Sequence, residues 1–394
     1  MSLLDLAAVG RLRAEPVDWR YKGMPPDVST VDGLIGRRVP VDGFTSPVAV
    51  LREPALRANL DTYARFCAGH GLDFAPHVKT TMAPQVAAAQ ARLGAWGFTV
   101  ATVAQARVLR AFGARRILIG HAVVDPAAVR WLAAEQEHAE IACWVDSPST
   151  VDILAGHDIP VYVELGAAGG RTGARGVAAA AEVARAVRAT PGPRFAGVSG
   201  YEGTYGRDRS PSSVSAVRAY LRDLVALGRT VYAPVVTAGG SAYPDLVAEE
   251  FAELGAGVGK VLRSGAYVAH DHGHYAHLSP FPLQPALRVW ATVIAVPEPG
   301  LALVNAGKRD VSFDLDLPVP LGVLRDGEPV PLTGVTVTAL NDQHAYLHDP
   351  AGELRVGDWV EAGISHPCTT FDRWPALPLV DADGRVVDLI RTYF

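Results

Sequence analysis

The chain has 394 residues, of which 49% are hydrophobic and 20% are charged, and its formal net charge is −5. This length and composition suit two folded domains and exclude an intrinsically disordered chain. The acidic balance argues against a dedicated nucleic-acid binder and against a polybasic membrane anchor. No apolar run reaches the roughly 18–20 residues that a membrane-spanning helix needs.

The N-terminal stretch MSLLDLAAVGRLRAEP contains a short apolar patch, but no basic stretch precedes it and no clear cleavage site follows it. We therefore expect no signal peptide. The chain has three cysteines, Cys67, Cys143 and Cys368. A small, odd number of cysteines does not suit a disulfide framework and fits a reducing compartment better. Together these features predict a cytoplasmic protein.

From about residue 46, short apolar and β-branched runs alternate with Ala- and Arg-rich stretches of helical period. The runs are Leu72–Ala75, Phe98–Val103, Arg116–Gly120, Glu140–Val145, Pro160–Leu165, Gly197–Glu202, Val235–Ala238 and Val258–Leu262. Eight strands that alternate with helices predict a (β/α)8 barrel over about residues 46–280. An open, doubly wound sheet is the rival prediction, because alternation alone does not separate closed from open sheets.

The sequence pattern changes after about residue 280. Segments such as ALRVWATVIAVPE, GVTVTALNDQHAYLH and GRVVDLIRTYF are rich in β-branched residues, have no helical period and are separated by Pro, Gly and Asp. They predict a second, all-β domain. We assign residues 281–394 to it, together with the irregular residues 1–45.

A lysine follows the first of the eight runs. In LDFAPHVKTTMAPQ the apolar run ends at Ala75, and Lys79 comes shortly after it. Residues at the C-terminal ends of barrel strands face the active-site mouth, where partial desolvation frees an amine for imine formation. The other lysines are Lys22 in the irregular N-terminal segment, Lys260 inside the eighth run and Lys308 in a turn of the β-rich region. Lys79 is therefore the candidate amine nucleophile, with Lys260 as its competitor.

The segment PHVKTT resembles the lysine motif of the fold-type III pyridoxal-phosphate enzymes, in the branch that contains D-threonine aldolase and D-serine dehydratase. Alanine racemase is a more distant relative of that branch, and the resemblance extends over nearly the whole chain. It implies an alanine-racemase-like barrel followed by a β domain, and an active site at a homodimer interface. It also implies that Lys79 holds pyridoxal phosphate as a Schiff base, with His77 beside the cofactor.

Two glycine-containing loops follow the seventh and eighth runs, where barrels commonly bind phosphate. They contribute Gly239, Gly240 and Ser241 in VVTAGGSAYPD, and Gly265, Ala266 and Tyr267 in LRSGAYVAHD. Glycine lets backbone N–H groups approach an anion closely, and serine adds a hydroxyl. The resemblance assigns both loops to the cofactor phosphate.

Two more residues match positions that the family places near the cofactor. Arg171 follows the fifth run in VYVELGAAGGRTGARG, and Tyr201 lies at the end of the sixth run in GYEGTYG. An arginine at the pyridine nitrogen makes the cofactor a weaker electron sink than a carboxylate does. Relatives usually have Tyr-x-Gly-His in this stretch, whereas Thr204 stands here in place of the histidine. This departure weakens the prediction of an aldolase.

His366 and Cys368, in GISHPCTTFDRW, form a candidate metal pair. Residues i and i+2 of a strand share a face, and imidazole with thiolate is a combination that zinc favours. By the resemblance, D-serine dehydratases carry His-x-Cys here and bind zinc, while D-threonine aldolases carry His-x-Asp and take harder divalent ions. Cys368 therefore favours zinc, with another divalent cation as the alternative, and favours the dehydratase.

A histidine-rich segment, AHDHGHYAH, follows the eighth run and contains His270, His272, His274 and His277. It predicts either a second metal site or a polar rim of the active site, and we favour the rim, with Asp271 and His272 as orienting groups. His344, in LNDQHAYL, resembles a family histidine to which we assign no role.

The function expected from these features is a pyridoxal-phosphate- and zinc-dependent dehydratase. It converts D-serine- or D-threonine-type 3-hydroxy amino acids to 2-oxo acids and ammonia, and it acts as a homodimer on a small-molecule substrate. The first alternative is retro-aldol cleavage to glycine and an aldehyde. An amino-acid racemase and a non-catalytic cofactor-binding protein are the remaining alternatives.

Overall fold

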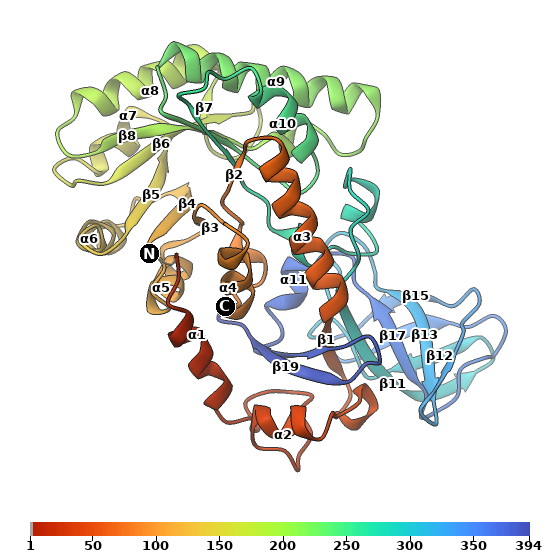
Figure 1. Cartoon of the computed structure of the whole chain (residues 1–394). Coiled ribbons are helices and arrows are strands. Elements are labelled where there is room, and N and C mark those ends of the chain that lie inside the picture. Colours follow the sequence, from red (N-terminus) through yellow and green to blue (C-terminus); the bar gives the residue numbers. More distant parts are fainter. Residues whose placement is uncertain (1–2) are drawn as a thin grey trace.

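The barrel expected from the alternating runs is built around one parallel sheet (Figure 1). The structure is a computed structural model that describes residues 3–394, so Met1 and Ser2, at the start of the stretch examined for a signal peptide, lie outside the described residues. Its strands are β2 (Asp73–Phe74), β3 (Phe98–Val100), β4 (Arg116–Ala122), β5 (Glu140–Val145), β6 (Pro160–Gly166), β7 (Ala174–Arg175), β8 (Arg194–Gly200), β9 (Val235–Ala238) and β10 (Gly259–Leu262). The order is β2-β10-β9-β8-β6-β5-β4-β3, and the short β7 pairs with β6. Every expected run overlaps one of these strands.

The first and last strands of this order also meet. Trp96 donates its backbone N–H to Phe74 O at 2.7 Å, and Thr99 donates to Pro76 O at 2.8 Å. His77 and Thr99 form a parallel bridge just beyond β2 and β3. These contacts close the sheet, so the prediction of a TIM-like barrel is confirmed over an open sheet.

Helices cover the outside of the barrel (Figure 1). They are α3 (Glu53–Gly69), α4 (Pro84–Arg92), α5 (Val103–Ala111), α6 (Pro126–Glu135), α7 (Pro148–Ile153), α8 (Val177–Ala189), α9 (Pro211–Thr230) and α10 (Pro244–Phe251). The side chains of Thr102, Asp125, Ser147 and Ser210 accept hydrogen bonds from the first turns of α5, α6, α7 and α9. Such caps satisfy N–H groups that have no partner within the helix, which explains where these helices begin.

Side chains alternate between the inside and the outside of the barrel. Along β4, Ile117 and Ile119 join the large core that the surrounding helices complete, whereas Leu118 belongs to a separate small cluster. That cluster also contains Trp144 and Tyr162 of the neighbouring strands β5 and β6. Successive strand residues point to opposite faces, so this cluster fills the barrel interior.

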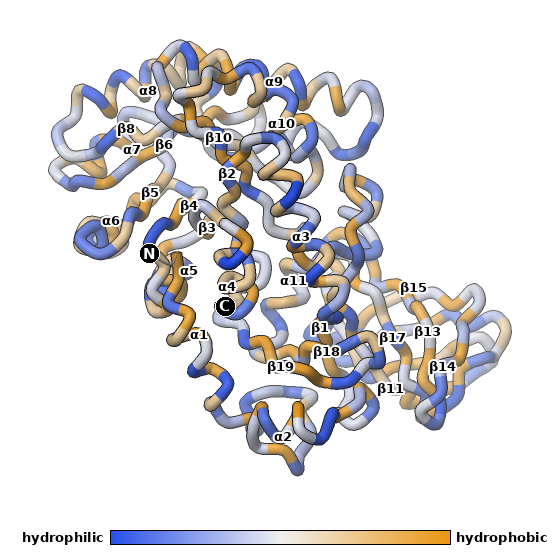
Figure 2. The backbone as a smooth tube through the Cα atoms, in the orientation of Figure 1, coloured by the Kyte–Doolittle hydropathy of each residue, from blue (hydrophilic) through white to orange (hydrophobic). Residues whose placement is uncertain are grey.

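A second, largely antiparallel sheet follows the barrel. Its strands are β1 (Val48–Arg52), β11 (Leu287–Glu298), β12 (Leu301–Val304), β13 (Val319–Arg325), β14 (Glu328–Val330), β15 (Thr336–Leu340), β16 (Ala345–His348), β17 (Trp359–Gly363), β18 (Ala376–Val380) and β19 (Val386–Arg391). The main path is β14-β13-β17-β11-β1-β18-β19, with β12, β16 and β15 attached through β11. Apolar residues concentrate on the strands of both sheets (Figure 2). The prediction of an all-β C-terminal domain is confirmed.

The first strand of the chain belongs to this second sheet. Residues 48–52 fall within the range assigned to the barrel, but β1 pairs antiparallel with β11 and parallel with β18. Val48, Ala49, Val50 and Leu51 are each at most 1% exposed, so both faces of β1 are covered. The domain that precedes and follows the barrel in sequence is therefore continuous in space, and it includes residues up to Arg52.

The N-terminal segment packs against both domains. Helix α1 (Leu6–Arg11) lies against α4, and Asp5 N donates to Phe112 O at 2.9 Å, so this part contacts the barrel. Helix α2 (Val31–Gly36) packs on β19, with Val31 and Leu34 buried in a second apolar cluster. Residues 1–45 are thus divided between the two domains rather than assigned to one of them.

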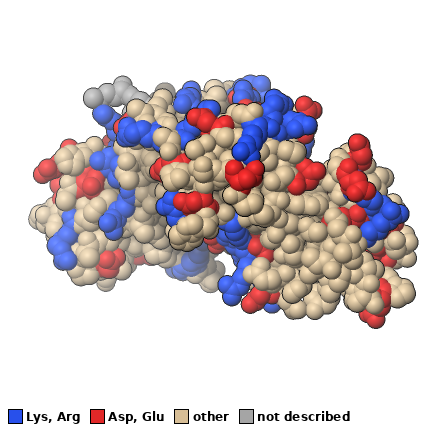
Figure 3. Space-filling model, turned by 90° about the horizontal axis from the view of Figure 1, so that it is seen from below, with Lys and Arg blue, Asp and Glu red and all other residues tan. Residues whose placement is uncertain are grey.

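Acidic and basic side chains are interspersed on the face of the molecule drawn in Figure 3. No continuous basic surface is visible on that face. Among residues 3–394, no helix is long and apolar enough to cross a membrane.

Candidate active site

Lys79 lies on a one-turn 3₁₀ helix, Val78–Thr80, directly after the bridge that closes the barrel. Val78 and Thr80 are buried at 2% and 1% exposure, whereas Lys79 is exposed. The turn is therefore anchored by its neighbours while the lysine side chain extends away from the core. This position is at the C-terminal ends of the barrel strands, where the sequence predicts the reactive amine.

The turn that carries Lys79 contacts the candidate metal pair of the C-terminal domain. Thr80 Oγ1 lies 3.3 Å from Cys368 Sγ, and the Cys368 side chain is close enough to His366 to raise the pKa of its imidazole. The fold thus brings together the lysine motif and the His-x-Cys motif, which are separated by nearly 290 residues of chain. Cys368 belongs to the domain that begins at β11, so the site lies between the two domains.

The backbone of the metal pair differs from the expectation. Strand β17 ends at Gly363, His366 lies in the following turn, and Cys368 begins the short helix α11 (Cys368–Phe371). The prediction that the two residues share one face of a strand is therefore wrong. Pro367 separates them, and it is the turn that directs both side chains to the same place.

Asp314 supports His366 and was not identified from the sequence. His366 Nδ1 lies 2.7 Å from Asp314 Oδ2, and Thr369 Oγ1 donates to Asp314 Oδ1 at 2.7 Å. Burial lowers the pKa of His366, but the Cys368 and Asp314 side chains outweigh burial and raise it to about 9. A carboxylate on one ring nitrogen fixes the imidazole and leaves the other nitrogen free for a metal. Among residues 3–394, no group of three or more His, Cys, Asp and Glu side chains forms a metal site.

The barrel side of the site is positively charged. Burial lowers the pKa of His77 well below its ordinary value, and the nearby charges of Lys79, Arg263 and Arg171 lower it further. The buried Nδ1 of His77 has no hydrogen-bond partner among residues 3–394. A neutral imidazole with three cations around it is an environment that attracts an anion such as a phosphate ester.

The two predicted glycine loops approach the strand ends so closely that no side chain fits. A Cβ on Gly239 would lie 1.9 Å from Arg263 O, and a Cβ on Gly265 would lie 2.4 Å from Thr80 Oγ1. A Cβ on Gly240 would lie 2.8 Å from Glu202 Oε1. The loops are therefore restricted to glycine by contact with the lysine turn and the barrel interior, as expected for a cradle that surrounds a small anion.

Ser241 lies in the same cradle. Its hydroxyl is buried and lies 2.8 Å from the hydroxyl of Ser264, which also contacts Tyr63 OH at 3.3 Å. Ser264 in turn accepts a backbone hydrogen bond from His77 at 2.8 Å. The serine is thus connected to the lysine turn through one intermediate residue.

Arg171 and Tyr201 are brought together. The guanidinium carbon of Arg171 lies 5.0 Å from the centre of the Tyr201 ring, in a cation–π geometry. Burial raises the pKa of Tyr201, and the Cys368 side chain is among the groups close enough to raise it further. Thr204, where the family resemblance led us to expect a histidine, is exposed and donates its hydroxyl to Tyr201 O at 3.2 Å.

Tyr267 and Ala266 lie on the loop after β10, but the Tyr267 side chain leaves the cradle. Its ring packs 4.0 Å from the ring of Tyr63, and its hydroxyl accepts a hydrogen bond from Gln90 at 2.9 Å. The structure therefore places the Tyr267 ring in the core behind the loop. Ala266 is buried at 3% exposure in the same 3₁₀ turn, Ala266–Val268.

Glu202 is a buried residue of the site that sequence reasoning missed. It is 0% exposed, and neither carboxylate oxygen has a hydrogen-bond partner among residues 3–394. Burial raises its pKa to about 7, although the charge of Arg263 acts in the opposite direction. Arg263 spans the barrel interior and donates to Thr237 Oγ1 at 3.0 Å and to Gly200 O at 2.6 Å.

The histidine-rich segment neither forms a metal cluster nor lies fully at the rim. His270 is 5% exposed, and burial lowers its pKa to about 4. Asp271 is fully buried and accepts three backbone N–H groups, from Gly273, Tyr275 and Ala276. Asp271 thus holds its own loop together, whereas His272 packs on Gly363 of β17. The expected role of the two residues as orienting groups of the active-site rim stays a prediction. His344 is exposed in the turn between β15 and β16, distant in sequence from the lysine motif.

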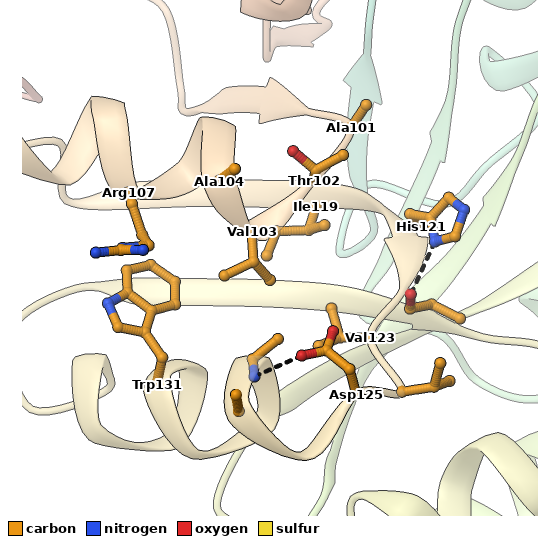
Figure 4. Close-up of a pocket in the computed structure, with 14 residues that line it drawn as sticks. Ala101, Thr102, Val103, Ala104, Arg107, Ile119, His121, Val123, Asp125 and Trp131 are labelled. Carbon is orange, nitrogen blue, oxygen red and sulfur yellow. Dashed lines mark hydrogen bonds between the residues drawn. The ribbon is translucent and has the colours of Figure 1, made fainter. Parts of the chain in front are cut away.

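A pocket of about 510 Å³ opens beside the mouth of the barrel, at the ends of β3 and β4 (Figure 4). Ala101 and Thr102 line it from one strand end, His121 and Val123 from the other, and Trp131 closes it from α6. The pocket is mostly apolar. Lys79, which we expect to take part in the reaction, lies after the end of the neighbouring strand β2.

Two family models match the chain. The model "Alanine racemase, N-terminal domain" matches residues 52–254, which is more than half of the chain. The chain belongs to this family. The model "Putative serine dehydratase domain" matches residues 286–380, which include His366 and Cys368. The two matches correspond to the barrel and to the C-terminal sheet.

Relatives of the chain include two kinds of lyase. A D-threonine aldolase from Arthrobacter sp. is 28% identical over 89% of this chain and 92% of its own length. A D-threo-3-hydroxyaspartate dehydratase from Delftia sp. (strain HT23) is 26% identical over 86% of this chain and 95% of its own length. These relatives confirm the expected family and the lyase class, and they support aldolase and dehydratase equally.

Solved structures agree with this fold. A D-threonine aldolase from Filomicrobium marinum superposes with a TM-score of 0.79 at 24% identity, over 90% of this chain and 96% of that one. The Delftia dehydratase superposes with a TM-score of 0.76 at 25% identity, over 89% of this chain and 98% of that one. Two variants of the dehydratase replace a histidine and the cysteine two residues after it with alanine, and the cysteine variant was solved in a metal-free form. The spacing of those two residues is the spacing of His366 and Cys368.

Proposed function

We propose that this protein is a pyridoxal-phosphate- and metal-dependent lyase that acts on D-amino acids with a 3-hydroxyl group, and that its reaction is dehydration to a 2-oxo acid and ammonia. The observation that carries the proposal is the 3.3 Å contact between Thr80 Oγ1 and Cys368 Sγ. It joins the turn of Lys79 to the metal pair, so one small substrate would reach both.

The residues of the barrel side fit pyridoxal phosphate. The glycine loops at Gly239, Gly240 and Gly265 leave no room for a Cβ, and His77 Nδ1 is a buried polar atom without a partner. Lys79 would hold the aldehyde of the cofactor, and the two loops with Ser241 would hold its phosphate. Arg171, stacked on Tyr201, would face the ring. When bound, the cofactor supplies an electron sink for the negative charge that develops at the substrate Cα.

The chain's own groups would then move the protons. Lys79 is an exposed amine at the centre of the site, and we assign to it the removal of the Cα proton. His77 stays neutral because burial and the surrounding cations lower its pKa. It would therefore orient the cofactor by hydrogen bonding, and it adds no further positive charge next to the lysine.

The metal pair fits a soft divalent ion such as zinc. Imidazole and thiolate converge, and Asp314 fixes the ring of His366 through Nδ1. A metal ion bound there acts as a Lewis acid on an oxygen ligand. The two D-threo-3-hydroxyaspartate dehydratase variants support this assignment, because a cysteine at the same spacing from a histidine was replaced in a metal-free form. Zinc is the proposed ion, with another divalent cation as the alternative.

Retro-aldol cleavage to glycine and an aldehyde is the second candidate function. The relationship to the Arthrobacter D-threonine aldolase favours it. Two residues of this chain favour dehydration instead. Cys368 is a soft ligand, and Thr204 stands where relatives usually have a histidine. Alanine racemases share the fold at 18% identity and a TM-score of 0.59, which supports the fold alone.

Product analysis separates these reactions. The purified protein, loaded with pyridoxal phosphate and zinc, is incubated with D-threonine and, in parallel, with D-threo-3-hydroxyaspartate. Release of ammonia with 2-oxobutanoate or oxaloacetate supports the dehydratase. Glycine with an aldehyde establishes the aldolase, and the conversion of D- to L-amino acid without cleavage establishes a racemase. If the loaded protein turns over neither substrate and binds no cofactor, the proposal is overturned.

We also propose a homodimer as the active form, because the site lies at the surface between two domains and Lys79 is exposed in one chain. Sedimentation equilibrium of the cofactor-loaded protein tests it. A mass of one chain at micromolar concentration, with full activity, would contradict this assignment.

A further inference from the structure

A second cavity, of about 410 Å³, lies in the C-terminal domain, on the face of its sheet that carries Val50 and Trp290. Its polar lining comes from Arg52, His272, Arg288, Glu361 and Asp381. The volume is in the range of small-molecule sites. None of the residues assigned above to the cofactor or the metal is among its lining residues, which all belong to the described part of the chain.

The pairing of the strands directs two arginines into this cavity. Val50 of β1 is directly opposite Arg288 of β11, and Arg52 follows Val50 by two residues. Residues that are opposite or two apart in strands point to the same face. Trp290, two residues after Arg288, pairs with Glu361 and adds a flat apolar wall to the same face.

The positive charge of Arg288 is balanced by a carboxylate of the protein. It is 6% exposed, its Nε donates to Glu361 Oε1 at 3.1 Å, and its Nη1 donates to Pro285 O at 2.8 Å. Burial lowers its pKa to about 10, which Glu361 partly reverses and the charge of Arg52 reinforces. The guanidinium is thus desolvated and paired with one carboxylate.

Asp381, the other acidic residue of the lining, accepts hydrogen bonds through both of its carboxylate oxygens. Its Oδ2 accepts from Arg38 Nη2 at 2.9 Å, and its Oδ1 accepts from the backbone N–H groups of Asp383 and Arg385. The charge of Asp381 is therefore balanced by Arg38.

Arg52 is the cation that stays unneutralised. Within residues 3–394, its side chain has no ion pair and no hydrogen bond, although it is half-buried and lines the cavity. It lies close enough to Arg288 and His272 to lower the pKa of each. His272 contributes a neutral imidazole whose buried Nδ1 has no partner in the same part of the chain.

We propose that this cavity is a binding site for a small organic anion, whose carboxylate is held by Arg52 with the His272 imidazole beside it and whose carbon skeleton lies against Trp290. A planar guanidinium binds a carboxylate through two parallel N–H···O bonds, and a partly buried cation without a counterion gains from such a ligand. The site is separate from Lys79 and from the metal pair.

The cavity is connected to the metal pair by two hydrogen bonds of the backbone. His272 N donates to Ile364 O at 2.9 Å, and His274 N donates to Ser365 O at 3.5 Å. Ile364 and Ser365 directly precede His366. The loop that carries His272 is therefore hydrogen-bonded to the segment that carries the proposed metal ligand.

Calorimetric titration of the full-length protein tests the proposal. Malonate is the probe, inorganic phosphate is titrated in parallel, and sodium chloride holds the ionic strength constant. We expect one saturable malonate site per chain, and at least tenfold weaker binding in Arg52→Gln. Saturation by phosphate that Arg52→Gln also weakens would assign the site to phosphate-bearing ligands, which contradicts the carboxylate specificity proposed here.

Two further variants control the experiment. Arg65→Gln removes an exposed arginine on α3, outside the cavity, and should leave malonate binding unchanged. Ala382→Trp fills the cavity from an exposed turn and keeps both arginines, so it should abolish binding even if Arg52→Gln does not fold. No saturable heat in the unsubstituted protein overturns the proposal, as does an equal loss in Arg52→Gln and Arg65→Gln. Neither result affects the proposed lyase function, because cofactor binding and product analysis are measured separately.

Discussion

The two sides of the site differ in how their residues are held. On the barrel side, Lys79 and the glycine loops lie directly after strands that fix their backbone. On the C-terminal side, His366 lies in a turn and Cys368 begins a four-residue helix. Backbone contacts give the barrel side its geometry. Side chains, above all Asp314, give the C-terminal side its geometry. Substitutions on the barrel side should therefore affect the cofactor, and those on the C-terminal side should affect the metal while the cofactor stays bound.

Lys79→Ala has the largest expected effect. It removes both the anchor of the cofactor and the proposed proton acceptor, and a positioned acid or base alone contributes roughly 10²–10⁴-fold. We expect at least about a 10³-fold loss of turnover together with loss of the visible absorbance of bound cofactor. Lys260→Ala, on strand β10, is the matched control and should keep both. If the two variants behave in the reverse manner, Lys260 is the reactive amine.

Cys368→Ser should separate the two sides of the site. The serine hydroxyl is a poor ligand for a soft metal, so we expect the zinc content to fall below stoichiometric while the cofactor absorbance remains. The expected loss of turnover is on the order of 10²-fold. Elemental analysis by mass spectrometry with an absorbance spectrum of the same sample checks both. Cys368→Asp replaces the soft thiolate with a harder ligand and should reduce the preference for zinc over manganese. Retention of stoichiometric zinc in Cys368→Ser would remove the thiolate from the metal site.

Asp314→Asn tests whether a side chain outside the ligand pair fixes its geometry. Loss of such an outer contact typically lowers metal affinity by roughly 10–100-fold. We expect that decrease in zinc affinity, measured by competition with a chelator, and an unchanged affinity for pyridoxal phosphate. Asp316→Asn is the control, since Asp316 is exposed and contacts the site through its backbone carbonyl, which accepts from Ser365 Oγ. Equal losses in the two variants would refute the orienting role.

Glu202→Gln should have its effect on stability. Burial raises the pKa of Glu202 to about 7, above the ordinary value of 4.5. Below pH 4.5 the carboxyl is neutral in the folded and unfolded states. As pH rises from 4.5 to 7 the unfolded state ionises first, so folding loses up to about 1.4 kcal/mol per pH unit from this group, and the loss is complete above pH 7.

The glutamine variant lacks this loss. Its free energy of unfolding, from urea titrations of the cofactor-free protein, should therefore fall less between pH 5 and 7 than that of the unsubstituted protein. Parallel pH profiles would mean that Glu202 is ionised in the folded state throughout this range.

The barrel side was predictable because its signals are local. The alternation of apolar runs with helical stretches placed Lys79, Gly239 and Gly265 at strand ends. The closure of the barrel is shown only by the contacts between β2 and β3 in the structure. A loop position does not determine where a side chain points, however. Tyr267 turns into the core because the rings of Tyr63 and Phe74 leave a space there.

The C-terminal side was less predictable because its contacts are distant in sequence. Asp314 precedes His366 by 52 residues and lies in a loop without a motif. The i, i+2 spacing of His366 and Cys368 suggested a strand, but Pro367 and the end of β17 produce a turn. Similarly, nothing in the local sequence of β1 reveals that its partners are β11 and β18.

The place of β1 has a consequence for biosynthesis. The ribosome releases Val48–Arg52 early, yet the partner strands Leu287–Glu298 and Ala376–Val380 emerge only after the whole barrel has been made. During that interval a short β-branched segment with two unpaired edges is a template for association with other chains. We expect nascent chains that stop before residue 287 to bind chaperones or aggregate more than complete chains do. Premature termination would then be costly for this protein even where the entire barrel has been synthesised.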